Sequence, residues 1–223
     1  MNRILVCLSA MLLISLSFVA SAGAAVFERD WKTPGDGLLT FDDVNQREWL
    51  DLSVSRLNQF PEPRLENAII EIAPGGLFEG FTWANRDDIR AFAASGGINI
   101  STSSIAVNQS PTTQVISLLG STFERDTPTF IRRSVGFIDE TQMEPSLQRQ
   151  VGALFRININ PATSEGFASL SFSSSDDSLD DDSTGLMLYR TIPEPSSTVL
   201  AVVGVLAFIR SRYRIALARP KKK

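Results

Sequence analysis

The segments TFIRRSVGFI at residues 129–138 and QVGALFRINI at residues 150–159 decide the fold of this chain. Both are rich in Val, Ile and Phe and are separated by turn-forming residues, a pattern typical of β-strands. Two further segments of the same character follow at 168–173 and 185–191. Because short strands that follow one another along a chain usually pair with their neighbours, this half of the chain predicts an antiparallel sheet.

Helical periodicity replaces the strand pattern in the first half of the chain. Apolar residues at i, i+3, i+4 and i+7 predict a helix over 64–73. Its apolar positions are Leu65, Ala68, Ile69 and Ile72. A second helix is predicted to begin after Asn85 as N-cap and to end at glycines 96–97, and a third is predicted over 112–119. With short strands at 38–41 and 47–52, residues 26–191 are predicted to form one α+β domain.

The first 24 residues have the three parts of a secretory signal peptide. Arg3 gives a positive start, residues 4–18 are almost entirely apolar, and small residues at 20–24 supply cleavage sites. The apolar run is shorter than the roughly 20 residues that a membrane-spanning helix needs. We therefore expect residues 1–24 to direct export and to be removed by signal peptidase.

A second apolar segment occupies residues 198–209 and is followed by a basic tail at 210–223. The triplet that precedes it consists of Pro193, Glu194 and Pro195. Positive charge beside a membrane segment marks the cytoplasmic side, so the tail predicts a transient tether in the inner membrane with the domain in the periplasm. Residues 61–63 repeat the triplet without such a segment, so the triplet alone implies no function.

This order of parts resembles the PEP-CTERM sorting domain of exported proteins from Gram-negative bacteria. The resemblance covers residues 192–223: the Pro-Glu-Pro triplet, an apolar run that contains Gly204, and the basic end. It implies processing near the triplet by an exosortase-like membrane protease, with the cell surface or extracellular matrix as destination. Family members are associated with exopolysaccharide and biofilm. Residues 48–52 (EWLDL) are similar to part of a domain that recurs in such proteins, for which the resemblance implies no activity.

Charge and composition argue against several functional classes. Residues 4–209 carry 13 basic and 25 acidic residues, a balance of −12, which argues against nucleic acid as a partner because phosphate binding needs a basic face. The chain has no histidine, and its one cysteine, Cys7, lies in the predicted signal peptide. We therefore expect no disulfide, no cysteine metal site and no imidazole-based catalysis in the exported domain.

Two features of the exported domain are candidates for ligand binding. The loop before the last predicted strand offers oxygen ligands of the kind that calcium prefers. These are Asp176, Asp177, Asp180, Asp181 and Asp182. The loop lacks the turn glycine of an EF-hand, and most acidic runs are solvated loops. Trp83, after a glycine-rich turn, is either a sugar-stacking residue or a buried aromatic, whereas Trp49 lies in an apolar segment and is expected in the core.

The sequence predicts an exported, non-catalytic protein of the cell surface or of an exopolysaccharide or biofilm matrix. The α+β domain is predicted to lie between a signal peptide and a C-terminal hydrophobic sorting helix. Its expected partners are signal peptidase, an exosortase-like protease, the inner membrane during transit and a matrix polysaccharide. The alternative is a carbohydrate-binding or calcium-assisted adhesion module, with calcium as the one candidate cofactor.

Overall fold

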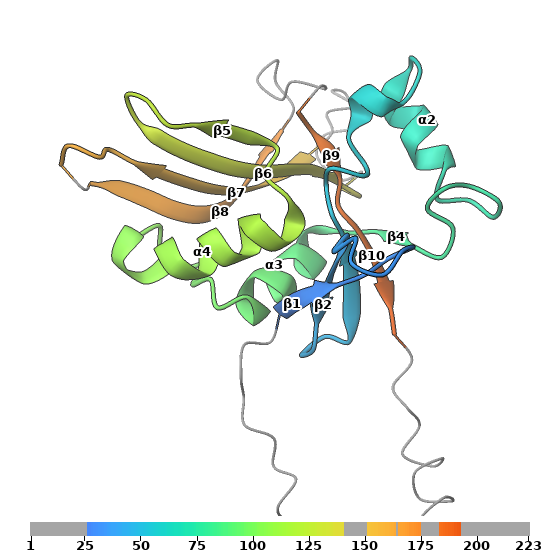
Figure 1. Cartoon of the computed structure of the whole chain (residues 1–223), viewed down its shortest axis with the longest axis horizontal. Helices are drawn as coiled ribbons and strands as arrows, with labels where there is room; N and C mark the ends of the chain where they lie inside the picture. Colours follow the sequence, from blue (N-terminus) through green and yellow to red (C-terminus); the bar gives the residue numbers. More distant parts are fainter. Residues whose placement is uncertain (1–25, 141–150, 164, 175–182, 193–223) are drawn as a thin grey trace, which may run out of the picture.

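The computed structural model describes residues 26–140, 151–163, 165–174 and 183–192. These residues form two β-sheets together with short helices (Figure 1). The predicted α+β class is confirmed. The predicted signal peptide and sorting segment, residues 1–24 and 193–223, lie outside the described residues.

The first sheet joins the beginning of the domain to its end. Its strand order is β1-β2-β3-β10-β4, and all neighbouring strands are antiparallel. The strands are β1 (Val26–Arg29), β2 (Leu39–Asp42), β3 (Arg47–Leu50), β4 (Thr82–Trp83) and β10 (Leu188–Thr191). Although β10 is last in the sequence, it lies inside the sheet between β3 and β4.

The second sheet contains the two segments that decide the fold. Its antiparallel strands are β5 (Phe123–Arg125), β6 (Phe130–Ile138), β7 (Val151–Ile159) and β8 (Gly166–Ser174), and β9 (Gly185–Leu186) pairs with β6 in parallel. Met187 connects β9 to β10. Its N–H donates to the carbonyl of Phe137 (3.0 Å), and its carbonyl accepts from the N–H of Ala84 (2.8 Å). One short segment therefore links the two sheets.

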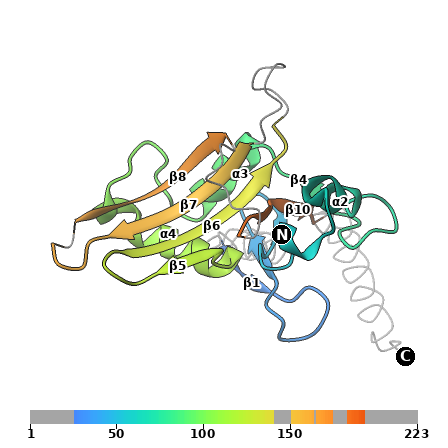
Figure 2. The same cartoon turned by 90° about the horizontal axis from the view of Figure 1, so that it is seen from above.

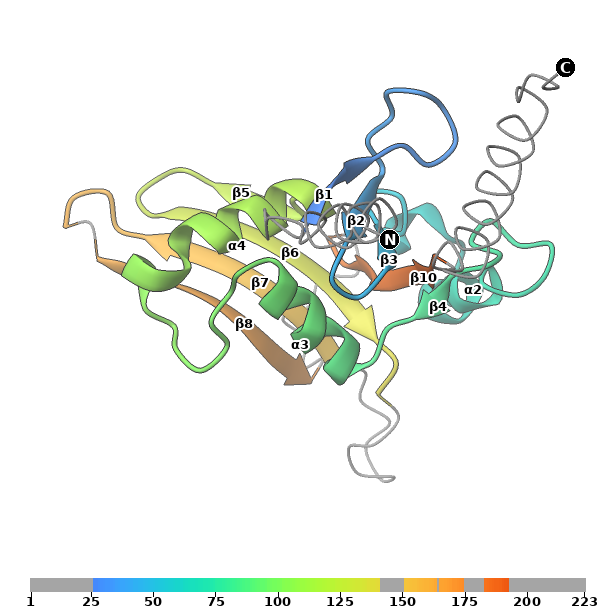
Figure 3. The same cartoon turned by 90° about the horizontal axis from the view of Figure 1, so that it is seen from below.

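Two helices cover one face of the second sheet. α3 (Arg86–Ser95) and α4 (Ile105–Leu119) place Phe92 and Val115 in the same buried cluster as Phe155 of β7. Figure 2 shows the sheet with these helices behind it, and Figure 3 shows the helices in front. The shorter α2 (Arg64–Ile70) follows the 3-10 turn η1 (Leu57–Gln59) and packs against the first sheet.

The alternation of side chains along the first sheet divides the core into two clusters. Trp49 and Tyr189 lie on the face that meets α3 and α4. Leu39, Leu50 and Leu188 lie on the other face, in a cluster that includes α2. Because both faces are covered, β2 is buried along its whole length.

The sequence predicted the start of one helix correctly and the start of another incorrectly. α3 begins after Asn85 as predicted, because the Asn85 side chain accepts from the N–H of Asp88 while the Asp88 carboxylate accepts from the N–H of Asn85, both at 3.0 Å. The helix predicted over 112–119 begins instead at Ile105. Pro111 lies inside it, one residue before the predicted start, so the predicted start was too late.

The pairing predicted for the last strand segment also differs from the structure. Residues 185–191 divide at Met187, and β10 joins the first sheet instead of the sheet of the second half. The physical reason is that β3 and β10 come from opposite ends of the domain. Their pairing depends on how both faces of the first sheet are buried, which local periodicity does not contain.

Candidate functional site

The two ends of the folded domain leave the first sheet at the same end of its strands. We call this row of strand ends the edge of the first sheet. The register pairs Val26 with Asp42, Asp42 with Arg47 and Arg47 with Thr191, which brings the four residues into one row. Three strand spacings separate Val26 from Thr191, a distance of about 14 Å. Figure 1 shows the start of β1 and the end of β10 on the lower side of the molecule.

β10, the strand that leads to the predicted sorting triplet, is firmly held in the sheet. The N–H of Ile192 donates to the carbonyl of Gln46 (2.9 Å) immediately after the strand ends. Glu48 lies opposite Arg190 in the register and is buried. Its Oε2 is 2.7 Å from Arg190 Nη2, and its Oε1 is 3.2 Å from Arg29 Nη1. These ion pairs fix β10 to β1 and β3 through side chains as well as backbone.

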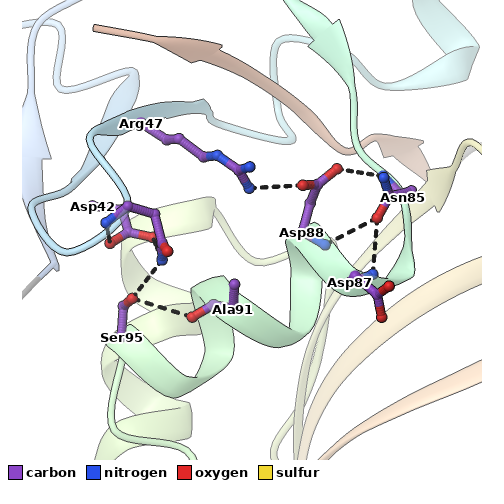
Figure 4. A network of polar contacts seen from close by, with 8 residues as sticks. Asp42, Arg47, Asn85, Asp87, Asp88, Ala91 and Ser95 are labelled. Carbon is purple, nitrogen blue, oxygen red and sulfur yellow. Dashed lines mark hydrogen bonds and ion pairs between the residues drawn. The ribbon is translucent and has the colours of Figure 1, made fainter.

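A network of polar contacts fastens the same edge to α3 (Figure 4). Asp42 is buried and accepts hydrogen bonds from the N–H groups of Val44 (3.1 Å) and Asn45 (3.0 Å) and from the Asn45 side-chain amide (2.7 Å). That amide also donates to Ser95 Oγ (2.8 Å), near the end of α3. The turn between β2 and β3 is therefore tied to the helix behind it.

Arg47 extends this network to the first turn of α3. Its Nη1 lies 2.8 Å from Asp88 Oδ1, an ion pair without hydrogen-bond alignment, and its guanidinium carbon lies 4.3 Å from the centre of the Tyr189 ring. Burial, and after it the carboxylate of Asp88, raises the pKa of Tyr189. Asp88 belongs to the cap of α3 and Arg47 to β3, so their ion pair joins the helix to the sheet. We therefore interpret the role of this network as structural.

A polar pocket of about 200 Å³ lies beside the C-terminal half of α4. It is lined by Thr113, Ile116, Ser117, Ser121, Glu124, Arg132 and Ile157. Glu124 and Arg132 are register partners on β5 and β6, with 3.6 Å between Glu124 Oε1 and Arg132 Nε. Arg132 Nε is buried and has no hydrogen-bond partner among the described residues. The pocket combines a carboxylate, a guanidinium, hydroxyls and apolar carbon, the kinds of group that line small-molecule sites.

Trp83, the predicted sugar-stacking residue, lies in β4 opposite Leu188 of β10. Its ring is half-buried against the cluster that includes α2. The indole Nε1 donates a hydrogen bond to the carbonyl of Phe137 (2.8 Å). The polar group of this side chain is therefore used within the fold, and stacking on a sugar stays a prediction.

The expectation that Trp49 belongs to the core is confirmed. Its side chain is 1% exposed, and its ring centre lies 4.7 Å from that of Phe92 and 5.2 Å from that of Tyr189. Trp31 is half-buried in the loop after β1, where it packs edge-on against Phe81 with ring centres 6.0 Å apart. Trp49 and Trp31 therefore pack on opposite faces of the first sheet, Trp49 from a strand and Trp31 from a loop.

Most of the predicted functional residues lie outside the described residues. These are Asp176, Asp177, Asp180, Asp181 and Asp182 of the predicted calcium loop, and Pro193, Glu194 and Pro195 of the sorting triplet. Within the described part of the chain, no three or more His, Cys, Asp or Glu side chains form a group that could hold a metal ion. In that same part, none of the helices has the length and apolar character required to cross a membrane.

Sequence reasoning missed the pocket because its residues are distant in the chain. Glu124 and Arg132 are opposite charges on two successive strands, which is a recognisable signal only once the register between β5 and β6 is known. Thr113 and Ser117 lie in the helix predicted over 112–119, but the sequence does not show that this helix packs beside β5 and β6. Comparisons with protein-family models, with curated proteins and with solved structures find no match for this chain.

Proposed function

We propose that this chain is an exported, non-catalytic protein of the cell surface or of an exopolysaccharide or biofilm matrix, delivered by an exosortase-like system. In this proposal signal peptidase removes residues 1–24. The apolar segment at 198–209 then holds the chain in the inner membrane, with the domain in the periplasm, until processing near the Pro-Glu-Pro triplet. The observation that carries the proposal is that the row from Val26 to Thr191 brings both ends of the domain to one sheet edge.

This edge suits a domain that lies between two membrane-directed segments. With both ends on one side, the signal peptide and the C-terminal segment can occupy the same membrane without crossing the domain. Processing at the triplet also leaves the fold intact, because β10 ends at Thr191 and its flanking hydrogen bond is made by Ile192. Every strand of the first sheet that the structure describes therefore lies before the triplet.

We predict that Glu194→Ala prevents C-terminal processing, because it removes the charged residue of the triplet. The full chain should then accumulate in the inner membrane with its basic tail, while the unchanged protein reaches the cell surface without it. The measurement is the mass of the protein recovered from each fraction. Glu62→Ala in the triplet at 61–63 is the matched control and should be processed normally, since Glu62 lies in the folded domain. Surface protein that retains residues 197–223 would contradict the proposal.

A second candidate function, carbohydrate binding, is favoured by the pocket beside α4. Its carboxylate and guanidinium can each bind two neighbouring sugar hydroxyls, and Ile116 and Ile157 can contact the ring. Trp83 offers a separate stacking surface at another place in the fold. A calcium-assisted form of this function, through the aspartates at 176–182, stays a prediction that calorimetric titration with calcium tests.

We predict that Arg132→Gln weakens binding of a sugar ligand by about tenfold or more, because it removes a charged hydrogen-bond donor from the pocket. The measurement is binding of the full chain to a glycan array. Trp83→Ala is the comparison that separates the two surfaces: it should leave binding at the pocket unchanged. Loss of binding in Trp83→Ala alone would move the site to β4, and no binding to any glycan would overturn the carbohydrate-binding candidate.

A further inference from the structure

The face of the second sheet that points away from α3 and α4 divides into a packed end and a charged end. At the packed end, Phe137 is buried in the cluster that includes α2. At the other end, two rows of side chains run across β5, β6, β7 and β8. The first row is Phe123, Arg133, Arg156 and Ser169, and the second is Arg125, Ile131, Asn158 and Phe167. Figure 2 looks onto this face of the four strands.

Three arginines gather at the charged end without acidic partners among the described residues. Arg133 and Arg156 are directly opposite each other in the β6–β7 register, and Arg125 is diagonal to Arg133. Within the described residues, no carboxylate lies within ion-pair distance of any of the three. Other arginines of the domain, such as Arg86 and Arg190, do have such partners. We call Arg125, Arg133 and Arg156 the arginine face.

Aromatic rings support the stems of two of these arginines. The guanidinium carbon of Arg133 lies 5.0 Å from the centre of the Phe123 ring, and that of Arg156 lies 4.7 Å from the centre of the Phe167 ring. Contacts of this kind reduce the freedom of a long side chain before any ligand arrives. Nε of both Arg133 and Arg156 is buried without an acceptor among the described residues.

A bound anion would reduce the electrostatic repulsion within the arginine face. Like charges directly opposite in an antiparallel pair repel each other. Burial lowers the pKa of Arg133 and of Arg156, and neighbouring arginine charges lower both further. A bound anion would offset both effects, because carboxylates accept paired hydrogen bonds from guanidinium groups.

We infer that the arginine face binds an acidic polysaccharide, a polymer that carries one carboxylate on each sugar. Adjacent strands lie about 4.8 Å apart, so Arg133 and Arg156 present their charges at close, regular spacing. Asn158, Ser169 and Ser171 lie on the same face of the sheet and can hydrogen-bond sugar hydroxyls. This inference rests on the proposed matrix function and names the class of polymer.

Contact with apolar ring faces favours a carboxylate polymer of sugars over nucleic acid. Residues 4–209 carry a balance of −12, which repels any polyanion, so the contacts at the arginine face must select the ligand. A polyuronate differs from a polyphosphate in the apolar ring faces that lie between its charges. Phe123 is 37% exposed and can contact such a ring face beside Arg133.

The test is binding of the full chain to immobilised polygalacturonate, with dextran as the neutral polymer and single-stranded DNA as the polyphosphate. The unchanged chain should bind polygalacturonate, more weakly as salt rises, and should bind the other two at least about tenfold less tightly. The double variant Arg133→Gln, Arg156→Gln should lose at least about tenfold in affinity. Arg90→Gln, which changes an exposed arginine of α3 on the other side of the sheet, should bind normally.

Circular dichroism of each variant shows whether the fold is kept. If the double variant does not fold, Arg125→Gln replaces it, because this arginine is exposed and should lose a smaller but measurable part of the affinity. Unchanged affinity in folded variants, or equally tight binding of DNA, would overturn the inference. Correct processing at the triplet together with no polygalacturonate binding would reject the arginine face as a site while leaving the delivery proposal intact.

Discussion

Trp49→Ala should lower the free energy of unfolding by about 3 to 5 kcal/mol, the range for removal of a large aromatic from a core. Trp49 is 1% exposed and packs against Phe92 of α3 and Tyr189 of β10. It therefore connects the first sheet to the helices that cover the second. The measurement is urea unfolding of the full chain followed by circular dichroism.

Two matched variants distinguish packing from other effects of the Trp49 change. Trp49→Phe keeps an aromatic ring and removes an indole N–H that is buried without a partner among the described residues, so it should cost far less than alanine. Trp31→Ala removes a half-buried tryptophan from a loop and should also have the smaller effect. Equal losses for Trp49→Ala and Trp49→Phe would show that ring packing does not stabilise this core.

Asn108→Ala should cost about 2 to 4 kcal/mol, because it leaves several backbone groups without their partner. Asn108 is fully buried in α4. Its amide donates to the carbonyls of Asn99 (2.9 Å), Thr102 (2.7 Å) and Ala168 (3.3 Å), and its Oδ1 accepts from the N–H of Asn99 (2.8 Å). One side chain thereby joins the loop after α3, the start of α4 and strand β8. The loss is measured as the change in urea midpoint at constant slope.

The neighbouring residue provides the control for this prediction. Gln109→Ala changes an exposed position of the same helix and should shift stability by no more than a few tenths of a kcal/mol. Asn108→Asp keeps the size of the side chain but directs a carboxylate oxygen at carbonyl groups, so it should destabilise at neutral pH as strongly as alanine. If Asn108→Asp unfolded like the unchanged protein, the hydrogen bonds of the amide would not be the source of the stability.

Local signals in the sequence predicted the secondary structure well where the residues that define an element are near one another in the chain. Asn85 followed by acidic residues predicted the first turn of α3, and the structure has a capping box there. The strand segments at 129–138 and 150–159 correspond to β6 and β7. The start of α4 was predicted too late, at residue 112, whereas the helix begins at Ile105 and contains Pro111.

The candidate sites were harder to predict than the fold. Glu124 and Arg132 meet only through the β5–β6 register, and Arg133 meets Arg156 only through the β6–β7 register. A shift of one residue in either register would turn these side chains to the opposite face. Trp83 was identified from its glycine-rich turn, but its hydrogen bond to Phe137 depends on packing that brings β4 close to β6.

The sequence by itself determined the α+β class, the cap of α3 and the burial of Trp49, because each depends on residues near one another in the chain. The export and sorting segments stay predictions of the sequence. Tertiary structure alone decided that β10 joins β3, and with it that Val26 and Thr191 leave one edge of the first sheet. It also decided the pocket and the arginine face. Strand pairing between distant segments is selected by burial of both faces of a sheet, a property of the whole domain that no local pattern records.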